Sequence, residues 1–214
     1  MAQFIEVIRL PGFVEYGQAM AIQRERRIAV EEGRAGNALY LLEHRPVITL
    51  GRSARRENLL LDADALAEQG IDLCETDRGG DVTYHGPGQL VAYPVLDLRQ
   101  WRQSIRWYLR QLEEVLIQQL ADYNIDAGRI EGLTGVWTAG RKVAAIGIAI
   151  RNWVTFHGIG LNVHPDLAHF DYIIPCGVPD KPVTSLHQLL GDAAPPMPQA
   201  MNDFEHHFRA HLGT

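Results

Sequence analysis

The stretch TGVWTAGRKVAAIGIAIRNWVTFHGIGLNV, residues 134–163, alternates β-forming residues with turn residues. Runs rich in valine, isoleucine, threonine and aromatic residues, bounded by such turns, are typical of strands joined by hairpins. We therefore expect three successive antiparallel strands here, and the fold class depends on what the rest of the chain adds to them.

Further strands are predicted before this stretch. Short apolar runs at 39–44, 47–51, 71–76 and 90–98 have the length and composition of β-strands. Pro94 cannot donate a hydrogen bond to a neighbouring strand. The strand over 90–98 is therefore expected at the edge of a sheet or interrupted at that residue.

Helical spacing of apolar side chains predicts helices at 16–32, 62–69, 104–123, 185–190 and 197–212. The clearest apolar stripe is that of the third helix, formed by Ile105, Tyr108, Leu112, Val115, Leu116, Gln119 and Leu120. Together the elements predict a mixed α/β (α+β) fold, with a largely antiparallel mixed sheet flanked by helices. No linker or composition shift divides residues 1–214, so a single domain is expected.

Charge and composition argue against several classes of protein. The net charge is −6 and the basic residues are scattered, so broad nucleic-acid binding is not expected. The N-terminal region carries Glu6 and no long apolar run, which predicts neither a signal peptide nor a membrane span. Two cysteines far apart in the sequence favour a reduced, cytoplasmic protein.

Two small basic groups are either solvated faces or docking patches for an acidic partner. They consist of Arg24, Arg26, Arg27 and of Arg52, Arg55, Arg56.

The glycine-rich segment RGGDVTYHGPGQLVAYPV, residues 78–95, raises the question of nucleotide binding. A Walker loop needs a lysine and a Ser/Thr after its last glycine, and a dinucleotide loop opens a helix. Here neither is present and a strand follows. The glycines instead allow the backbone to approach a ligand or a neighbouring strand closely. Arg78, Thr83, Tyr84, His85 and Gln89 could then line a site, and a structural turn around a core tyrosine is the alternative.

Histidine and cysteine spacing gives no support for a metal site, because neither H-E-x-x-H nor C-x-x-C occurs. A histidine beside a turn is more often a hydrogen-bonded structural residue than a catalyst. We therefore interpret His85 as structural or pocket-shaping.

A candidate nucleophile lies in IIPCGVPDKPVTSL, residues 173–186. Cys176 stands between a proline, which fixes φ, and a glycine, which frees the backbone, and such a turn can hold one side chain in a defined pose. Cys74, inside the strand-like run IDLCET, is instead interpreted as structural.

A cysteine nucleophile reacts as its thiolate, and a free thiol has a pKa of about 8.5. A base must therefore lie nearby, and the candidate is Lys142 in AGRKVAAIGIAI. Its apolar neighbours would desolvate the ammonium and lower its pKa, allowing proton exchange with a thiol. A surface lysine after a Gly-Arg turn is the alternative reading, and a histidine partner for the cysteine is also conceivable.

Six motifs in a fixed order make the chain resemble a known family, the lipoyl(octanoyl) transferases, also called lipoate-protein ligase B. The motifs are EHRPVITLGR (43–52), RGGDVTYHGPGQLVAYPV (78–95), GVW (135–137), RKVAAIGI (141–148), FHGIGLNV (156–163) and IIPCG with VTSL (173–177 and 183–186). They extend over most of the chain, and six linked motifs are far more specific than any single one.

The resemblance implies a fold shared with biotin and lipoate protein ligases and a ping-pong acyl transfer. Cys176 would take octanoyl from the phosphopantetheine thioester of octanoyl-acyl carrier protein. A lysine ε-amine would then accept it on apo lipoyl domains, those of 2-oxoacid dehydrogenase E2 subunits and of the glycine cleavage H protein. Lys142 would lower the pKa of Cys176 and shuttle protons. No ATP, metal or other cofactor is implied, since the donor is already a thioester.

The resemblance also implies substrate contacts, so that the glycine-rich loop would hold an acyl chain whose methylenes contribute about 0.8 kcal/mol each when buried. The implied contacts are Arg78, Gly79, Gly80, Asp81, Val82, Thr83, Tyr84, His85, Ala145, Ile146, Gly147, Gly158, Ile159 and Gly160.

Two alternatives remain on this reading. An ATP-dependent lipoate-protein ligase of the same fold resembles R-R-x-x-G-G-G-x-V-[FY]-H-D, and this chain lacks the third glycine and the aspartate after the histidine. A catalytically silent module that binds lipoyl domains is the other, and the presence of both Cys176 and Lys142 argues against it.

Overall fold

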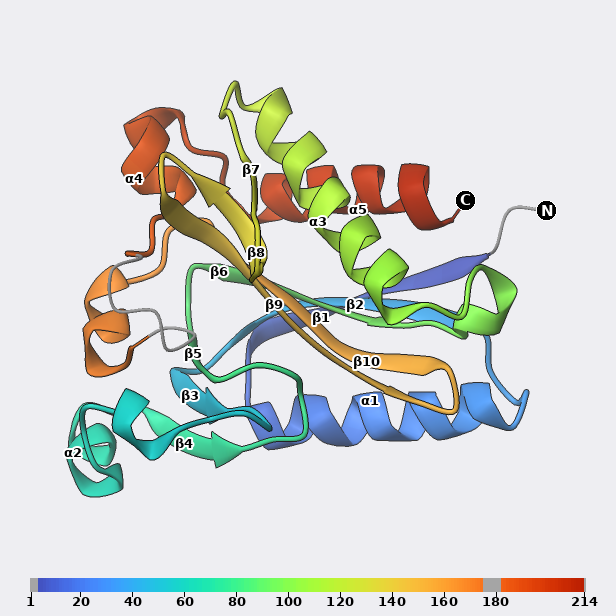
Figure 1. Cartoon of the computed structure of the whole chain (residues 1–214), viewed down its shortest axis with the longest axis horizontal. Helices are drawn as coiled ribbons and strands as arrows, with labels where there is room; N and C mark the ends of the chain where they lie inside the picture. The colour runs from blue at the N-terminus through green and yellow to red at the C-terminus, as the bar shows by residue number, and fades with distance from the viewer. Residues whose placement is uncertain (1–3, 175–181, 214) are drawn as a thin grey trace.

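The computed structural model describes residues 4–174 and 182–213. A seven-stranded sheet runs through the middle of the molecule in the order β1-β2-β6-β10-β9-β8-β7 (Figure 1). All neighbouring strands are antiparallel except β1 and β2, which are parallel. The strands are β1 (Ile5–Val14), β2 (Asn37–His44), β6 (Gln89–Val95), β7 (Gly128–Ile130), β8 (Leu133–Thr138), β9 (Arg141–Arg151) and β10 (Val154–Asn162).

The three strands expected over 134–163 are confirmed as β8, β9 and β10, which pair consecutively and antiparallel. The long β9–β10 ladder runs from the Arg151–Val154 pair at its turn to the Ala144–Leu161 pair. β1 was not predicted, because residues 5–14 show no clear apolar alternation. In the structure its pairing with β2 has a register shift between Arg9 and Phe13.

A second, three-stranded sheet lies beside the first, in the order β4-β3-β5. Its strands are β3 (Val47–Leu50), β4 (Asp72–Glu75) and β5 (Val82–His85). β3 pairs parallel with β4 and antiparallel with β5. The sequence predicted most of these strands but not their separation into a second sheet, since strand order depends on long-range pairing.

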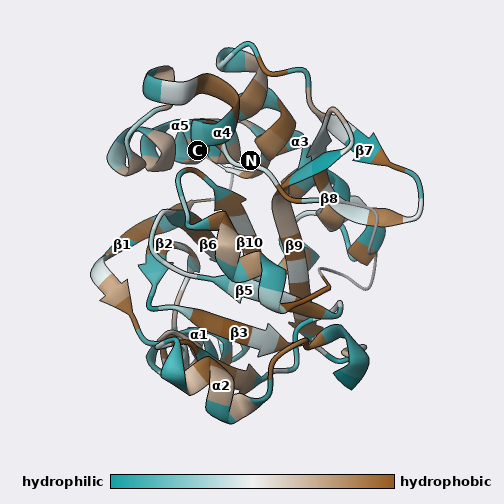
Figure 2. Ribbon diagram, turned by 90° about the vertical axis from the view of Figure 1, so that its left-hand side faces the viewer, coloured by the Kyte–Doolittle hydropathy of each residue, from teal (hydrophilic) through white to brown (hydrophobic). Residues whose placement is uncertain are grey.

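Helices cover both faces of the large sheet, with α3 and α5 on one side and α1 on the other (Figures 1 and 2). All five predicted helices are confirmed, as α1 (Tyr16–Glu31), α2 (Ala63–Glu68), α3 (Ile105–Asp122), α4 (Leu186–Leu190) and α5 (Met197–Leu212). Short 3₁₀ turns are η1 (Arg56–Asn58), η2 (Leu98–Gln100), η3 (Leu167–Tyr172) and η5 (Gly191–Ala193).

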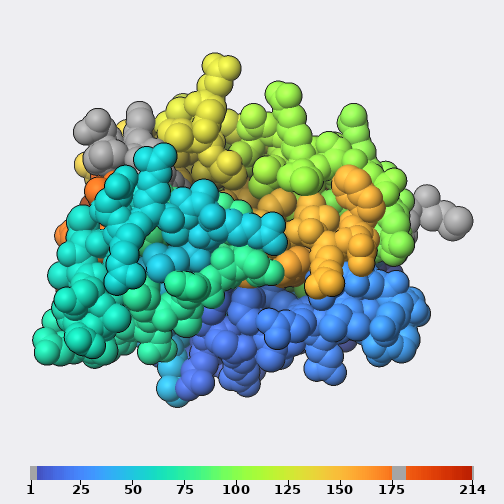
Figure 3. Space-filling view, turned by 60° about the horizontal axis from the view of Figure 1, so that its bottom comes forward, coloured from blue at the N-terminus to red at the C-terminus, as the bar shows by residue number. Residues whose placement is uncertain are grey.

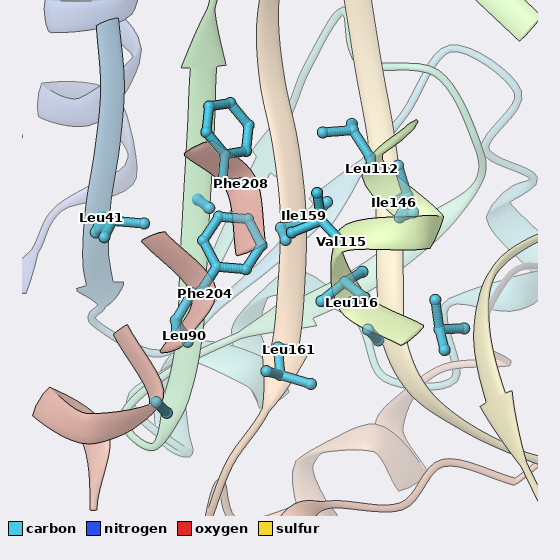
Figure 4. Packing of buried hydrophobic residues seen from close by; sticks show 14 of the residues in the cluster. Leu41, Leu90, Leu112, Val115, Leu116, Ile146, Ile159, Leu161, Phe204 and Phe208 are labelled. Atoms are coloured by element: carbon cyan, nitrogen blue, oxygen red, sulfur yellow. The ribbon is translucent and has the colours of Figure 1, made fainter. Parts of the chain in front are cut away.

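The main core fills the space between the sheet and helices α3 and α5 (Figure 4). Its aliphatic and aromatic side chains are fully or nearly fully buried, each contributing roughly 1.5–3 kcal/mol by burial. They include Leu41, Leu90, Leu112, Val115, Leu116, Ile159, Leu161, Phe204 and Phe208. The stripe predicted on α3 forms part of this core, except that Ile105 is 52% exposed because it occupies the first helical turn, at the rim of a groove described below.

Pro94 does not lie at an edge, so that part of the prediction is wrong: β6 is central, between β2 and β10. The interruption, however, is present, because continuous pairing with β10 stops at the Ala92–Ile159 pair. A Cβ on Gly158 would lie 2.9 Å from Cδ of Pro94, so the proline ring faces β10. Beyond it, the hydroxyl of Thr155 donates to the carbonyl of Pro94 at 2.7 Å and accepts from the amide of Leu96 at 3.0 Å.

No helix in the described part of the chain is long and apolar enough to cross a membrane.

Candidate active site

The glycine-rich loop lies against β9 and closes a cavity between the two sheets. The amide of Gly79 donates to the carbonyl of Ile148 at 2.8 Å, and a Cβ on Gly147 would approach the Gly79 carbonyl oxygen to 2.9 Å. We call this hollow the central cavity. It is lined by Tyr16, Arg78, Gly79, Gly80, Asp81, Val82, Thr83, His85, Tyr93, Ala145, Ile146, Gly147, His157, Gly158, Ile159 and Gly160.

Every residue predicted as a substrate contact lines this cavity except Tyr84. Successive side chains of a strand point to opposite faces, so β5 directs Thr83 and His85 inward and Tyr84 outward. The hydroxyl of Tyr84 contacts Nδ1 of His169 at 2.8 Å, and its ring packs edge-on against Phe170. Tyr84 therefore belongs to the core of the small sheet.

Arg78 is a buried bridge between the loop and β3. Its Nε and Nη2 donate to the hydroxyl of Thr49 at 3.0 and 2.9 Å, and Nη2 also donates to the Thr49 carbonyl at 2.6 Å. Nη1 donates to the carbonyl of Gly79 at 3.2 Å. The guanidinium thus fixes the start of the loop, and it also lines the central cavity.

Glycines in this region permit close approach of backbone and side-chain atoms from neighbouring segments. A Cβ on Gly51 would overlap the carbonyl oxygen of Gly80, whose own φ is +92°. A Cβ on Gly160 would lie 2.7 Å from Oε1 of Gln89. Of the two uses predicted for the glycines of 78–95, approach to a neighbouring strand is seen at Gly79, where a Cβ would lie 3.2 Å from the Ile148 carbonyl oxygen of β9.

His85 and Tyr93 line the cavity, and neutral polar groups lie behind them. Nδ1 of His85 donates to Oε1 of Gln89 at 2.6 Å, and Nε2 of Gln89 donates to Asn162 at 2.9 Å. Burial, reinforced by the neighbouring His44, lowers the pKa of His85 to about 3. His44 donates from Nδ1 to the Val14 carbonyl at 2.8 Å, and its Nε2 accepts from the Tyr93 hydroxyl at 2.8 Å.

Burial lowers the pKa of His44 to about 4, so both imidazoles are neutral at pH 7. His85, the glycines and Ile159 form a part of the lining that suits an uncharged ligand, while the charged Arg78 and Asp81 are held by hydrogen bonds to other residues.

Lys142 lies near the start of β9 with only 5% of its surface exposed. Its Nζ is 4.7 Å from the centre of the Trp137 ring, close enough for a cation–π interaction. A Cβ on Gly135 would lie 3.4 Å from Cε of Lys142 and 2.6 Å from the carbonyl oxygen of Ala144. The glycine of the GVW motif therefore leaves room for the lysine stem.

Lys142 borders a groove that continues into the central cavity. We call it the open groove. It is also lined by Ile105, Leu109 and Asn58, and it shares with the central cavity Gly79, Gly80, Asp81, Ile146 and Gly147. A ligand could therefore extend from the buried ammonium region inward beneath the glycine-rich loop.

Cys176 lies outside the described residues. On one side of the undescribed segment, Ile174 lines the open groove and its amide donates to the Asn58 carbonyl at 2.8 Å. On the other side, the carbonyl of Pro182 accepts from the amide of Lys142 at 2.9 Å. The described residues before and after Cys176 thus lie at the groove and beside Lys142.

Cys74 lies on β4, where burial is the main cause that raises the pKa of its thiol, with Asp72 adding to it. A raised pKa reduces the thiolate fraction and makes a poor nucleophile. Cys74 lines neither the central cavity nor the open groove.

Sequence reasoning gave no role to three residues that line the central cavity, Tyr16, Tyr93 and His157. His157 directly precedes Gly158 in a motif that was recognised, and strand alternation from Val91 could have placed Tyr93. Tyr16 begins a helix far away in the sequence, and nothing local indicates its place. Among the described residues, no group of three or more His, Cys, Asp or Glu side chains could hold a metal ion.

Comparisons with known proteins point to one family. The model of the lipoyl protein ligase A/B catalytic domain family matches residues 15–211. An octanoyltransferase of Solibacter usitatus is 52% identical over 182 residues, covering 85% of this chain and 82% of the relative. An octanoyltransferase of Nitratidesulfovibrio vulgaris is 47% identical over 199 residues, covering 93% and 91%.

Solved structures share the fold at low identity. A lipoate-protein ligase A bound with ATP superposes with a TM-score of 0.76 at 18% identity, covering 99% of this chain and 86% of that one. A bi-partite lipoate protein ligase from Thermoplasma acidophilum gives 0.73 at 19% identity, covering 99% and 84%. A biotin protein ligase from Aquifex aeolicus gives 0.54 at 12% identity, covering 98% and 69%. The predicted fold class is therefore confirmed.

The chain belongs to the lipoyl protein ligase A/B catalytic domain family. Within that family it stands with the octanoyltransferases, and it is an acyltransferase.

Proposed function

We propose that the chain transfers an octanoyl group from octanoyl-acyl carrier protein, through a thioester on Cys176, to a lysine ε-amine of apo lipoyl domains. The main support is the set of lining residues that the open groove beside Lys142 shares with the central cavity. Residues on either side of the Cys176 segment lie at that groove and beside Lys142. The acceptor class follows from the family, whose members include ligases that act on lipoyl domains.

The first half-reaction replaces one thioester with another. Lys142 takes the proton of Cys176, and the thiolate attacks the octanoyl carbonyl. The C–S bond to phosphopantetheine breaks, and Lys142 returns the proton to the leaving thiolate. In the second half-reaction the acceptor amine attacks the acyl-enzyme, loses a proton and forms an amide, and Cys176 leaves as the thiol.

The central cavity would hold the octanoyl tail. The buried His85 that lines it is neutral at pH 7, so apolar methylenes displace water there without burying an unpaired charge. Each methylene removed from water contributes about 0.8 kcal/mol to binding.

Asp81 supports a reaction that needs no ATP. It takes the position of the third glycine of the ligase motif and lines both the cavity and the groove. Its carboxylate accepts from the amides of Val82 at 2.8 Å and Arg55 at 3.1 Å, and from Nδ2 of Asn58 at 2.5 Å. A fixed negative charge here disfavours a triphosphate, whereas a thioester donor is neutral at the reacting end.

We propose that the carrier protein docks over Arg52, Arg55 and Arg56, which are exposed near the open groove. Acyl carrier proteins are acidic, and surface arginines would steer them to the site. In this group Arg55 lies 3.6 Å from the equally exposed Glu57, whereas in the other group Arg26 pairs with Glu6 and Arg27 with Glu31. Charge reversal at Arg52, Arg55 and Arg56 should raise the KM for the carrier, and an unchanged KM would exclude this dock.

The decisive experiment is intact-mass analysis after mixing the protein with octanoyl-acyl carrier protein in the absence of ATP and metal. We expect a hydroxylamine-sensitive octanoyl adduct in the wild type and in Cys74→Ala, and none in Cys176→Ala. A lipoyl domain that is octanoylated only from free octanoate plus ATP would instead establish an ATP-dependent ligase.

The proposed nucleophile must be a free thiol, which requires a reducing compartment, and we propose the cytoplasm.

A further inference from the structure

The inner end of the central cavity is separated from a second surface groove by a thin wall. This rear groove lies between α1, residues 74–77 and the β9–β10 hairpin, and Tyr16 lines both hollows. Figure 3 looks at the face where α1 (blue), the segment around 50–80 (cyan to green) and the hairpin (orange) meet. Along β9, Lys142 lines the open groove, Ala145 and Gly147 line the central cavity, and Ile150 lines the rear groove, so the open groove and the rear groove lie toward opposite ends of this strand.

The imidazole of His157 lies between the two hollows. It lines the central cavity with its side chain only 1% exposed, whereas Asp77, which lines the rear groove, is 57% exposed. Nε2 of His157 donates to Oδ1 of Asp77 at 2.7 Å, so one hydrogen bond joins the inside of the wall to its outside. Beside it, the hydroxyl of Tyr16 donates to Oγ1 of Thr76 at 3.1 Å.

The backbone of β10 directs His157 into this position. The strand leaves its ladder with β6 opposite Pro94, and His157 adopts a left-handed φ of +57°. Its amide donates to Oε1 of Gln23 at 2.7 Å. Nδ1 of His157 is buried and has no hydrogen-bond partner among the described residues. Within this part of the chain, the imidazole ring is therefore held by the hydrogen bond from Nε2 to Asp77.

We propose that His157, held by Asp77, is the plug that sets the longest acyl chain the central cavity accepts. This inference rests on the proposed function, because the cavity must hold an acyl tail with its carbonyl toward Lys142. Without the imidazole, the cavity would continue into the rear groove, and a longer tail would find additional apolar surface at Phe156 and Met20.

Glycine is the informative substitution at this position, because it adopts a left-handed φ without strain. His157→Gly therefore removes the plug and leaves the backbone conformation accessible. A buried methylene changes affinity by roughly fourfold, so two more methylenes should favour a ten-carbon over an eight-carbon chain by roughly tenfold or more relative to the wild type.

Asp77 offers a second, milder variant that does not alter the buried ring. Asp77→Ala removes the acceptor and frees the imidazole to turn, so the preference should move in the same direction by a smaller factor. Asp77→Asn retains an oxygen that accepts from Nε2 and serves as the matched control, with the wild-type preference.

The test is a competition among octanoyl-, decanoyl- and dodecanoyl-acyl carrier proteins, read as the ratio of acyl adducts by intact mass. Binding of free saturated fatty acids of eight to fourteen carbons, by displacement of a fluorescent fatty acid, gives a second reading that needs no turnover. A shift toward longer chains in His157→Gly and Asp77→Ala, absent in Asp77→Asn, supports the plug.

Unchanged length preference in both variants, by adducts and by binding, would overturn the plug while leaving the proposed function intact. A wild type that forms no octanoyl adduct would instead refute the proposed function. In that case the length dependence of fatty-acid binding still decides whether His157 closes the cavity.

Discussion

Lys142 and Thr184 are joined by a backbone hydrogen bond, in which the Thr184 amide donates to the Lys142 carbonyl at 2.9 Å. The Lys142 amide donates in turn to the Pro182 carbonyl, also at 2.9 Å, forming an isolated parallel bridge between Lys142 and Val183. β10 pairs with β9 only as far as Ala144. Beyond the end of β10, residues 182–184 pair with β9 in its place. Strand geometry thus ties the chain that follows Cys176 directly to the candidate base.

Replacing Lys142 with methionine should slow formation of the acyl-enzyme by roughly 10²- to 10⁴-fold, the usual contribution of a positioned acid–base group. Methionine keeps an unbranched stem of similar length, so packing against Trp137 is largely retained. The rate is measured by quenched-flow mass analysis with octanoyl-acyl carrier protein.

The pH dependence separates a proton-transfer role from a structural one. Without the base, Cys176 must ionise with the ordinary thiol pKa of about 8.5, so the rate of the methionine variant should rise steeply between roughly pH 7 and 9. A loss of equal size at every pH in that range would argue that Lys142 only supports the structure.

Gly135→Ala should destabilise the protein and reduce transfer together. Gly135 has a φ of +123°, and a Cβ there would approach the Ala144 carbonyl oxygen to 2.6 Å. Strain of this kind costs about 1–3 kcal/mol, and the shift of Ala144 would be passed to Lys142 two residues earlier. Urea unfolding measures the loss of stability, and Gly140→Ala is a control that isolates the cost of positive φ, since nothing lies near its added Cβ. Equal losses for both variants would show that crowding at Gly135 contributes nothing.

Acid should destabilise the protein through its buried neutral histidines. Burial lowers the pKa of His44 to about 4, against about 6.5 in the unfolded chain, so below pH 6.5 the unfolded state binds the extra proton. Stability is therefore fully present above that pH and falls as the pH drops toward 4. Each such histidine contributes a slope of about 1.4 kcal/mol per pH unit in this window.

His44→Gln removes one titrating group and retains atoms that can serve the Val14 carbonyl and the Tyr93 hydroxyl. The free energy of unfolding, measured in urea at several values between pH 6 and 4.5, should have a slope lower by about 1.4 kcal/mol per pH unit. An identical slope in the variant and the wild type would mean that His44 does not titrate on unfolding.

Local signals in the sequence were enough for most elements. All five helices and the three strands after Leu133 follow from apolar periodicity and turn residues, since both are short-range properties. Ser104 and Asp62 accept amide hydrogen bonds at the starts of α3 and α2, as their side chains favour. The division into two sheets and the central place of β6 depend on pairing between distant segments, which no local pattern encodes.

The candidate site divides in the same way. Motif resemblance named nearly all of the cavity lining, but it could not tell that Tyr84 points outward or that Arg78 is engaged with Thr49. Tyr16 and His157 join the site only because α1 and a distorted β10 pack against each other. The distortion originates at Pro94. The sequence predicted that this proline would interrupt a strand ladder, but not that β10 would be the strand beside it.

Asp81→Ala should loosen the mouth of the site, because three donors lose one acceptor. The backbone amides of Val82 and Arg55 would lose their acceptor. The side chain of Asn58, which is only 6% exposed, would be left with an unsatisfied Nδ2 donor. Leaving such a donor unpaired costs about 1–3 kcal/mol, which thermal unfolding would detect as a lower Tm. Since residues 55–58 border the open groove, KM for the carrier should rise as well.

Asp81→Asn is the matched control, because its amide oxygen still accepts from the two backbone amides. It should keep most of the stability while removing the negative charge. If the charge also excludes phosphates, both variants should bind ATP more tightly than the wild type, as isothermal titration would show. Tighter ATP binding in Asp81→Ala alone would mean that the size of the side chain, and not its charge, excludes ATP. Unchanged ATP binding in both variants would mean that Asp81 does not determine whether the protein uses ATP or a thioester donor.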